Sequence, residues 1–110
     1  MASGTVAQPL GVVNFTNQCT FPKGTPAVCT AVAYGKLVVV SYQGPAGTYA
    51  NYDVLVSLPS KYAPSVHTVG SCSLNSVSAG TINVENGAIA LGFAPSGTGR
   101  VYFQVCYFIA

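Results

Sequence analysis

Charged side chains are scarce in this 110-residue chain, and their scarcity excludes several classes of protein. Four residues are basic and two are acidic, so charged residues make up 5% of the sequence, against about 25% in an ordinary soluble domain. A net charge of +2 from so few ions forms no basic stripe, so no nucleic-acid partner is expected. Intrinsic disorder requires low hydrophobicity, whereas half of these residues are hydrophobic.

The sequence also lacks a long apolar run. The longest aliphatic stretch, residues 37–40, is far below the roughly 18 residues of a membrane span, so no membrane partner is expected. The first ten residues contain no basic region followed by an apolar region, which argues against a signal peptide. We expect residues 1–8 to form an N-terminal arm or a remnant of cloning, and residues 9–110 to form a single domain.

The four cysteines indicate neither a metal site nor a unique disulfide. They contain no CxxC pair, so we expect no structural zinc and no cofactor. Cys19 and Cys29 flank a turn-rich segment whose ends could meet in a disulfide. Four cysteines allow three pairings, however, and we favour reduced thiols.

Turn-forming residues recur roughly every eight to twelve positions and separate short segments rich in Val, Ile, Tyr, Phe and Thr. This pattern is typical of an all-β sandwich or barrel. No stretch shows the sustained apolar stripe of period 3.6 that would predict a long helix. The expected strands are 9–15, 28–34, 36–42, 50–58, 66–73, 79–85, 88–93 and 100–109.

The clearest local prediction is a β-hairpin in residues 81–91. Asn86-Gly87 suits a two-residue type I′ turn, which requires positive φ at both positions. The turn sets three facing pairs: Glu85 with Ala88, Val84 with Ile89, and Ile82 with Leu91. Because the four larger apolar side chains then share one face, we expect that face to lie in the core.

The segment 100–109 is apolar on both faces, which predicts a strand buried on both sides. One face is expected to pack in the core and the other against a neighbouring subunit. Residues 36–42 have the same character and could equally form a central strand. Low charge with high apolar content favours association, although a Val- and Ala-rich monomer is the alternative. The expected interface with a neighbouring subunit comprises Phe103, Val105, Tyr107 and Ile109.

Residues 51–109 carry a set of weak motifs in a fixed order: a strand ending in Leu-Pro, a short loop, a G-T-I-x-V-x-N-G hairpin and an aromatic last strand. The positions concerned are Leu58, Pro59, Tyr62, Pro64, Ser65, Gly80, Ile82, Val84, Gly87, Ile89 and Tyr107. Their order resembles the C-terminal head domains of receptor-binding proteins, at the baseplate or tail-fibre tip, from tailed bacteriophages of Gram-positive hosts. The resemblance implies an antiparallel β-sandwich of jelly-roll type, of about eight strands. It also implies a homotrimer on the virion that contacts other virion proteins and binds host cell-wall saccharide.

The residues give no support to catalysis. A glycosidase with paired carboxylates would need both acidic residues, Asp53 and Glu85, and Glu85 is expected in a solvated turn. His67 and Cys72 lie five residues apart on one expected strand, so their side chains point to opposite faces. No GxSxG, P-loop or HExxH motif is present. We therefore interpret the chain as non-enzymatic.

A saccharide site is expected where the strand around Tyr52 and Asp53 meets the loop of Tyr62 near His67. Tyrosine offers an apolar face for sugar stacking and a hydroxyl for hydrogen bonds, and a carboxylate accepts sugar hydroxyls. Several tyrosines will instead serve in the core or at its rim. His67 has two other interpretations: an exposed residue with no special role, or one of three copies that bind an anion or metal on a three-fold axis.

Two other functional classes stay open. The chain could be a structural decoration or fibre-tip protein of a phage capsid or tail, without a ligand. It could also be a secreted lectin or a C1q/TNF-like module, although that class is expected to carry a signal peptide.

Overall fold

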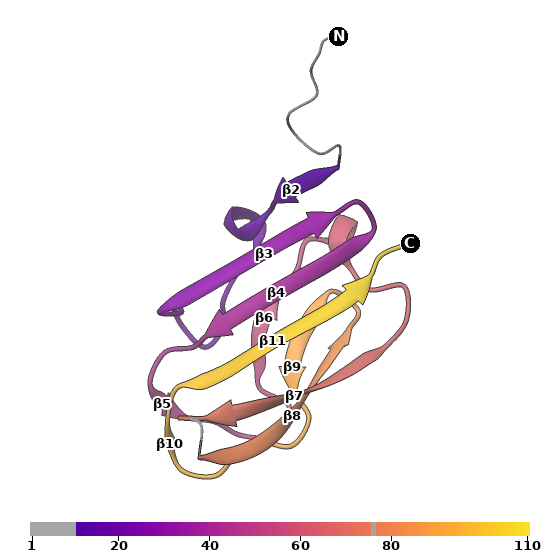
Figure 1. The fold of residues 1–110 in the computed structure, drawn as a ribbon. Coiled ribbons are helices and arrows are strands. Elements are labelled where there is room, and N and C mark those ends of the chain that lie inside the picture. Colours follow the sequence, from indigo (N-terminus) through magenta and orange to yellow (C-terminus); the bar gives the residue numbers. More distant parts are fainter. Residues whose placement is uncertain (1–10, 76) are drawn as a thin grey trace, which may run out of the picture.

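The computed structural model describes residues 11–75 and 77–110, which form an almost entirely β structure (Figure 1). The predicted N-terminal arm, residues 1–8, lies outside the described residues. Eight strands make one antiparallel sheet in the order β2-β3-β4-β11-β7-β8-β9-β6. Their bounds are β2 (Val12–Asn14), β3 (Val28–Tyr34), β4 (Leu37–Gln43), β6 (Val54–Ser57), β7 (Thr68–Leu74), β8 (Ser78–Glu85), β9 (Ala88–Leu91) and β11 (Val101–Phe108).

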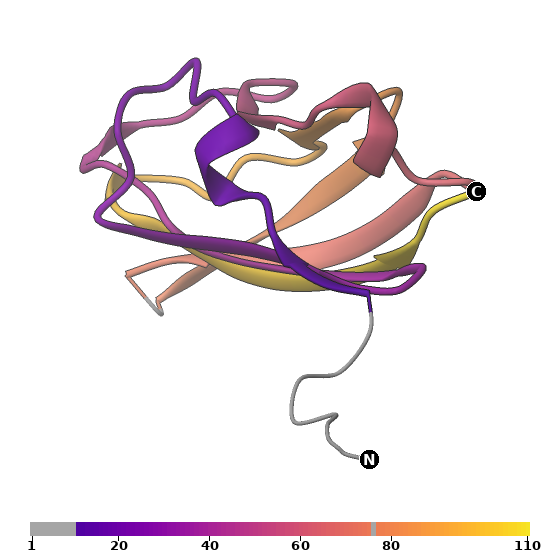
Figure 2. The same ribbon diagram turned by 90° about the horizontal axis from the view of Figure 1, so that it is seen from above.

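Four short elements complete the fold. β5 (Gly47–Thr48) and β10 (Thr98–Gly99) pair with each other, and η1 (Thr16–Gln18) and η2 (Ser60–Tyr62) are single 3₁₀ turns. Both 3₁₀ turns lie across the interior from β3, β4 and β11, so that they cover the core from the opposite side (Figure 2).

The sheet curls until its two edges approach each other. β2 and β6 are the edge strands, and the chain that follows β2 and η1 reaches β6 through Thr20. Thr20 and Ser57 exchange two backbone hydrogen bonds, with N···O distances of 3.1 and 2.8 Å. The predicted all-β, antiparallel, sandwich-like fold is confirmed.

Each of the eight predicted segments contains a strand, but the segment 50–58 contains the largest error. Only residues 54–57 are strand, and residues 50–53 form a turn instead. Within that turn the carboxylate of Asp53 accepts a hydrogen bond from the Ala50 amide at 2.9 Å, and Tyr52 adopts a left-handed backbone with φ of 70°. The hydrogen bond between the Asp53 side chain and the backbone thus stabilises a turn where a strand was predicted.

The hairpin between β8 and β9 has the predicted turn and register. Asn86 and Gly87 have φ of 50° and 79°, and Glu85 faces Ala88 as expected. The larger apolar side chains of the hairpin are fully buried: Ile82, Val84, Ile89 and Leu91. The prediction that this face forms the core is confirmed.

The predicted trimer interface is wrong in its choice of face. Phe103, Val105 and Tyr107 are only 3–7% exposed and belong to the core of the chain itself, and Ile109 packs against that core. The reason is that β11 lies between β4 and β7 in the curled sheet, and its odd-numbered residues point to the inside of the curl. The even-numbered residues point outward.

Candidate functional site

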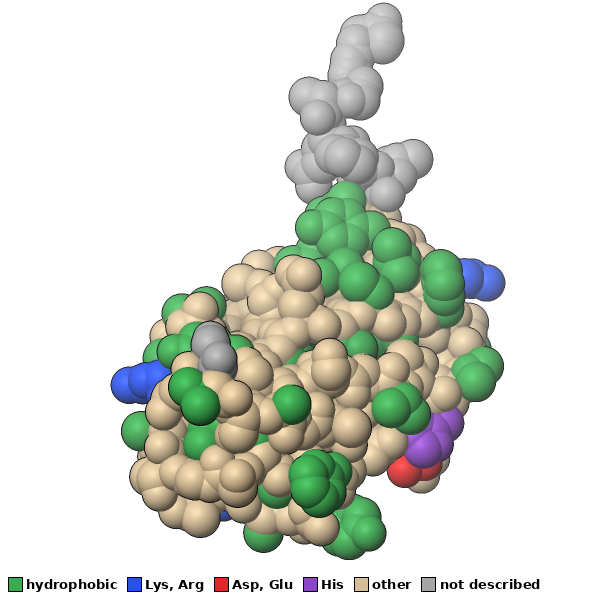
Figure 3. Space-filling model, turned by 60° about the horizontal axis from the view of Figure 1, so that its bottom comes forward, with side chains coloured by type: hydrophobic (Ala, Val, Ile, Leu, Met, Phe, Trp, Pro, Cys, Tyr) green, Lys and Arg blue, Asp and Glu red, His purple; other side chains and the backbone are tan. Residues whose placement is uncertain are grey.

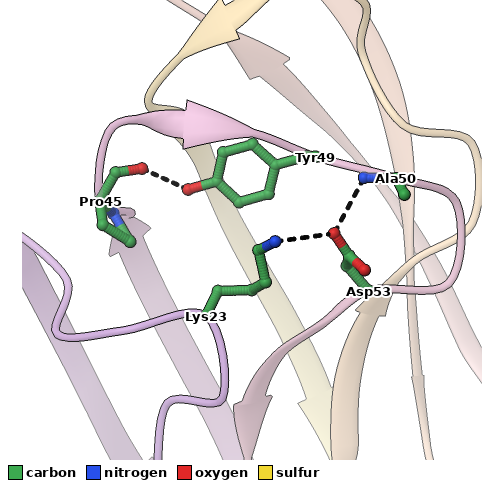
Figure 4. Close-up of polar contacts among 5 residues, drawn as sticks. All are labelled: Lys23, Pro45, Tyr49, Ala50 and Asp53. Atoms are coloured by element: carbon green, nitrogen blue, oxygen red, sulfur yellow. Dashed lines mark hydrogen bonds and ion pairs between the residues drawn. The ribbon is translucent and has the colours of Figure 1, made fainter.

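A cluster of polar contacts surrounds Asp53, where three segments of the chain meet (Figure 4). The Oδ2 atom of Asp53 accepts the Ala50 amide hydrogen bond and lies 3.2 Å from Nζ of Lys23. The Lys23 ammonium also lies 5.3 Å from the centre of the Tyr49 ring. The hydroxyl of Tyr49 in turn donates a hydrogen bond to the carbonyl of Pro45. These contacts fasten the loop before β3 to the turn before β6.

Asp53 is held in its ionised form at this corner. The hydrogen bond from the Ala50 amide, with a smaller contribution from Lys23, lowers the pKa of Asp53 against the opposing effect of partial burial. Both contacts use Oδ2, which leaves Oδ1 free to accept a hydrogen bond from a ligand. Because Lys23 balances the charge, the corner suits a neutral ligand better than a cation.

Tyr52 presents its ring to solvent from a strained backbone position. Its side chain is 78% exposed, and a positive φ is uncommon for any residue other than glycine. The Tyr52 amide donates to the Leu91 carbonyl at 2.9 Å, and the Asn51 side chain accepts the Ala94 amide at 2.8 Å. These bonds clamp the turn against the end of β9 and the loop after it.

A second exposed aromatic ring, that of Phe93, belongs to this same loop. Phe93 is 63% exposed and directly precedes Ala94, which is bonded to Asn51. We name the segments 50–53 and 92–94 the aromatic turn. It combines two exposed rings from adjacent segments with an ionised carboxylate.

The structure does not bring the four predicted saccharide-binding residues together. Tyr52 and Asp53 share the aromatic turn, but β8 and β9 separate the strand that follows Asp53 from the strand that follows His67. Tyr62 is 4% exposed and stacks on Phe15 with ring centroids 4.0 Å apart. Its prediction as a ligand contact is therefore wrong, because the loop carrying it folds inward over the core.

His67 lies directly before β7 and makes contacts of its own. Its Nε2 atom is 2.9 Å from Oδ1 of Asn83, and its Nδ1 atom is 3.5 Å from Oε2 of Glu85. Glu85 is thus more than a solvated turn residue, since it lies beside a partner in the segment that leads into β7. Among the described residues no group of three His, Cys, Asp or Glu side chains is arranged to hold a metal ion.

Sequence reasoning missed Lys23, Phe93 and Asn83. The hairpin register put Asn83 on the outward side of β8, but its contact with His67 also requires the pairing of β7 with β8. Nothing in the spacing relates Lys23 to Asp53, which lies thirty positions later in the chain.

The four cysteines, all within the described residues, are free thiols. Burial, with a smaller effect of the nearby Cys29, raises the pKa of Cys19 to about 11. Burial also raises the pKa of Cys29 and of Cys72. A raised pKa lowers the thiolate fraction, so these three thiols are poor nucleophiles and poor metal ligands. Cys106 alone among the four is exposed.

A broad uncharged surface covers the outward side of the three neighbouring strands β3, β4 and β11. We name it the outer face and define it by the outward residues of β3, β4 and β11: Val28, Thr30, Val32, Tyr34, Leu37, Val39, Ser41, Gln43, Tyr102, Gln104, Cys106 and Phe108. Figure 3 shows hydrophobic and uncharged side chains over most of the surface in view, with the charged side chains at its margins.

No protein-family model matches this sequence, and no curated protein matches it. No helix in residues 11–75 or 77–110 has the length and apolar character needed to cross a membrane. The surfaces of the molecule itself, together with the resemblance in residues 51–109, are therefore the basis for assigning a function.

Proposed function

We propose that this chain is a non-enzymatic adhesion domain of a bacteriophage virion, which binds saccharide on the host cell surface as an assembly of identical copies, expected to be a trimer. The observation that carries the proposal is the aromatic turn, with its exposed Tyr52 ring beside the ionised Asp53. The phage class and the jelly-roll subtype rest on the resemblance in residues 51–109.

The backbone at Tyr52 favours a role for its side chain. Glycine or asparagine would adopt a φ of 70° at lower cost. Strain of this kind, of order 1 kcal/mol or more, is typical of ligand-binding sites. An exposed tyrosine ring contributes little to the core, so contact with a ligand accounts best for a tyrosine at this strained position.

The chemistry of the turn suits a neutral sugar. An aromatic ring stacks on the C–H face of a pyranose, and Oδ1 of Asp53 can accept a hydrogen bond from a sugar hydroxyl. Asp53 is fixed by Ala50 and Lys23, which limits the entropy lost when a ligand binds. The low charge of the whole chain favours a neutral polysaccharide over an anionic one.

The positions of the two acidic residues support binding without hydrolysis. Asp53 lies beside Leu91, to whose amide its carbonyl is bonded, whereas Glu85 faces Ala88 at the other end of β9. Each carboxylate lies beside a basic side chain, Lys23 for Asp53 and His67 for Glu85. A glycosidase would place its two carboxylates on either side of one glycosidic bond.

The test is adsorption of the labelled protein to a panel of purified Gram-positive cell-wall polysaccharides. Tyr52→Ala should weaken binding at least about tenfold, which corresponds to roughly 1.4 kcal/mol, because the stacking surface is lost. Tyr52→Phe should retain most of the binding, since it keeps the ring.

Val77→Ala provides the control, because Val77 is highly exposed and lies in the turn between β7 and β8. This variant should bind like the wild type. Failure of the wild type to bind any polysaccharide of the panel, or equal binding by Tyr52→Ala, would contradict the adhesion proposal.

The second candidate function is structural decoration of a capsid or tail without a ligand. The outer face favours it, because a large neutral surface serves assembly as well as it serves adhesion. This function predicts stable attachment to virions that purified polysaccharide does not displace, with no adsorption to host cells.

A further inference from the structure

We infer that the outer face is the surface through which copies of this chain bind one another. This inference rests on the proposed function for the need to assemble, and it names the partners as other copies of this chain, whose outer faces meet around the symmetry axis of the assembly. It also replaces the predicted interface, whose residues face the core.

Most of the apolar side chains of the outer face lie in two neighbouring rows of its four. Tyr34, Leu37 and Phe108 form one row across β3, β4 and β11. The next row consists of Val32, Val39 and Cys106. Tyr34 is 52% exposed and Phe108 is 64% exposed. Soluble monomers rarely leave a contiguous apolar surface of this kind uncovered.

The other two rows of the outer face carry no charge. Thr30, Ser41 and Gln104 form the third row, and the Gln104 side-chain amide donates to the Ser41 hydroxyl at 2.9 Å. Polar groups that are already bonded to each other lose less on burial than groups that are bonded only to water, so the third row can enter an interface at small cost. The last row consists of Val28, Gln43 and Tyr102, of which Val28 is 47% exposed.

The absence of charge identifies the occupant. None of the twelve residues of the outer face carries a formal charge, so a charged partner would find nothing there to complement it. An identical face is neutral in the same way, and its approach meets little electrostatic repulsion because each chain has a net charge of only +2. Lys36, in the turn between β3 and β4, borders the face without entering it.

The shape of the outer face, with a projecting ring next to a hollow, also suits contact with a second copy. A hollow of about 260 Å³ lies beside Phe108 and is lined by Leu37, Ser65, Val66, Thr68, Cys106, Tyr107 and Phe108. Sites for drug-sized ligands measure about 300–1,000 Å³, so this hollow fits one or two side chains better than such a ligand. A projecting ring and a hollow on one surface are what contact between identical faces requires.

The size of the outer face predicts a contact at the small end of specific interfaces. Its three strands, about 4.8 Å apart and about seven residues long, project over roughly 340 Å². Side-chain relief makes the accessible area larger than this projection, in the range of the weak, transient contacts that bury less than about 600 Å² per partner.

Two matched variants test the inference by sedimentation velocity and light scattering at about 50 µM. Phe108→Lys puts a charge into the outer face, whereas Phe93→Lys makes the same change at an equally exposed phenylalanine of the aromatic turn. The wild type and Phe93→Lys should form the same dimer or trimer. Phe108→Lys should raise the concentration needed for half-assembly at least tenfold.

Cross-linking provides a second measurement, which does not depend on the Phe108→Lys substitution. A short bismaleimide should link copies of the wild type through Cys106, and Cys106→Ser should abolish the linked species. Circular dichroism and thermal unfolding establish that each variant is folded. A monomeric wild type, equal masses for the two lysine variants, or no Cys106-dependent cross-link would overturn the inference.

Polysaccharide adsorption of the same variants separates this inference from the adhesion proposal. Phe93→Lys should stay assembled and lose adsorption, whereas Phe108→Lys should lose assembly and retain weaker, single-site adsorption. Assembly without adsorption in the wild type leaves the outer-face contact standing and contradicts adhesion. Adsorption by a monomeric wild type would instead contradict the outer-face contact and leave saccharide binding standing.

Discussion

The two faces of β11 are similar in hydrophobicity and opposite in their surroundings. Phe103 points inward and is 7% exposed, whereas Phe108 on the same strand points outward and is 64% exposed. The difference lies in what covers each face. η1, η2 and β6 close over the inner side, while no described part of the chain covers the outer side of Phe108. A strand with two apolar faces therefore indicates that both are used, but it does not say which one the chain itself covers.

Truncation of one phenylalanine on each face should give the largest difference in stability. Phe103→Ala removes a buried ring that stacks on Tyr42 with centroids 5.0 Å apart, and should lower the free energy of unfolding by about 3–5 kcal/mol. Phe108→Ala should change it by no more than about 0.5 kcal/mol in the dissociated chain. Urea denaturation at concentrations below assembly measures both values, and similar losses would show that the faces are assigned wrongly.

Two glycines differ in the same way, because a Cβ atom would clash with neighbouring atoms at Gly80 and would meet none at Gly47. A Cβ atom at Gly80 would lie 2.4 Å from the Phe93 carbonyl oxygen, so Gly80→Ala should destabilise the protein by about 1–3 kcal/mol. Gly47 has nothing within 4 Å of such an atom and no positive φ, so Gly47→Ala should stabilise by up to about 1 kcal/mol. Thermal unfolding monitored by circular dichroism distinguishes them, and an unaffected Gly80→Ala would contradict the close packing between β8 and the loop after β9.

The inner face also holds two tyrosines whose hydroxyl groups differ. The Tyr107 hydroxyl donates to the Tyr62 carbonyl at 2.8 Å, so Tyr107→Phe should cost about 0.5–1.5 kcal/mol. The buried hydroxyl of Tyr42 has no hydrogen-bond partner within the described residues, so Tyr42→Phe should be neutral or stabilise by up to about 1 kcal/mol. If chemical denaturation shows the same loss for both, Tyr42 has a partner that the described residues do not include.

The smallest expected effect is on the pH dependence of stability. It comes from Asp53, because neither face of β11 carries a formal charge. The pKa of Asp53 is lower in the folded chain than in the unfolded chain, where it is about 3.9. Its contribution to stability is therefore complete above the unfolded pKa and is lost as the pH falls through the folded one. Asp53→Asn should flatten the fall in stability between about pH 5 and pH 2. Glu85→Gln serves as the control, and an identical flattening by that variant would refute the special role of Asp53.

Local signals explain why most of the fold was predictable. The Asn86-Gly87 turn defines the register of its hairpin without help from the rest of the chain. Alternating apolar residues likewise located the strands, because both signals act over a few neighbouring positions. The strand prediction failed at residues 50–53, because the Asp53 side chain accepts a hydrogen bond from the backbone there and stabilises a turn.

The candidate site was less predictable because its contacts join distant segments. Tyr62 looked like a loop residue available to a ligand, but Phe15, far away in the sequence, stacks on its ring. Positions that carry the phage resemblance also bond to one another: the Leu58 amide donates to the Gly87 carbonyl, and the Tyr107 hydroxyl donates to the Tyr62 carbonyl. Those positions therefore report on how the sandwich is built, whereas the residues that we propose to face a ligand, Tyr52 and Asp53, are not among them.

The bridge between Thr20 and Ser57 has a consequence for the durability of the molecule. Two backbone hydrogen bonds hold this seam, whereas β4 and β11 are paired over seven positions. Rupture of the seam would uncover the free edge of β6, a four-residue strand of high β propensity, and such an edge recruits strands from other chains. Amide hydrogens at the seam should accordingly exchange with solvent before those of β4. We therefore expect opening of this bridge to be the first step by which the protein aggregates during heating or long storage.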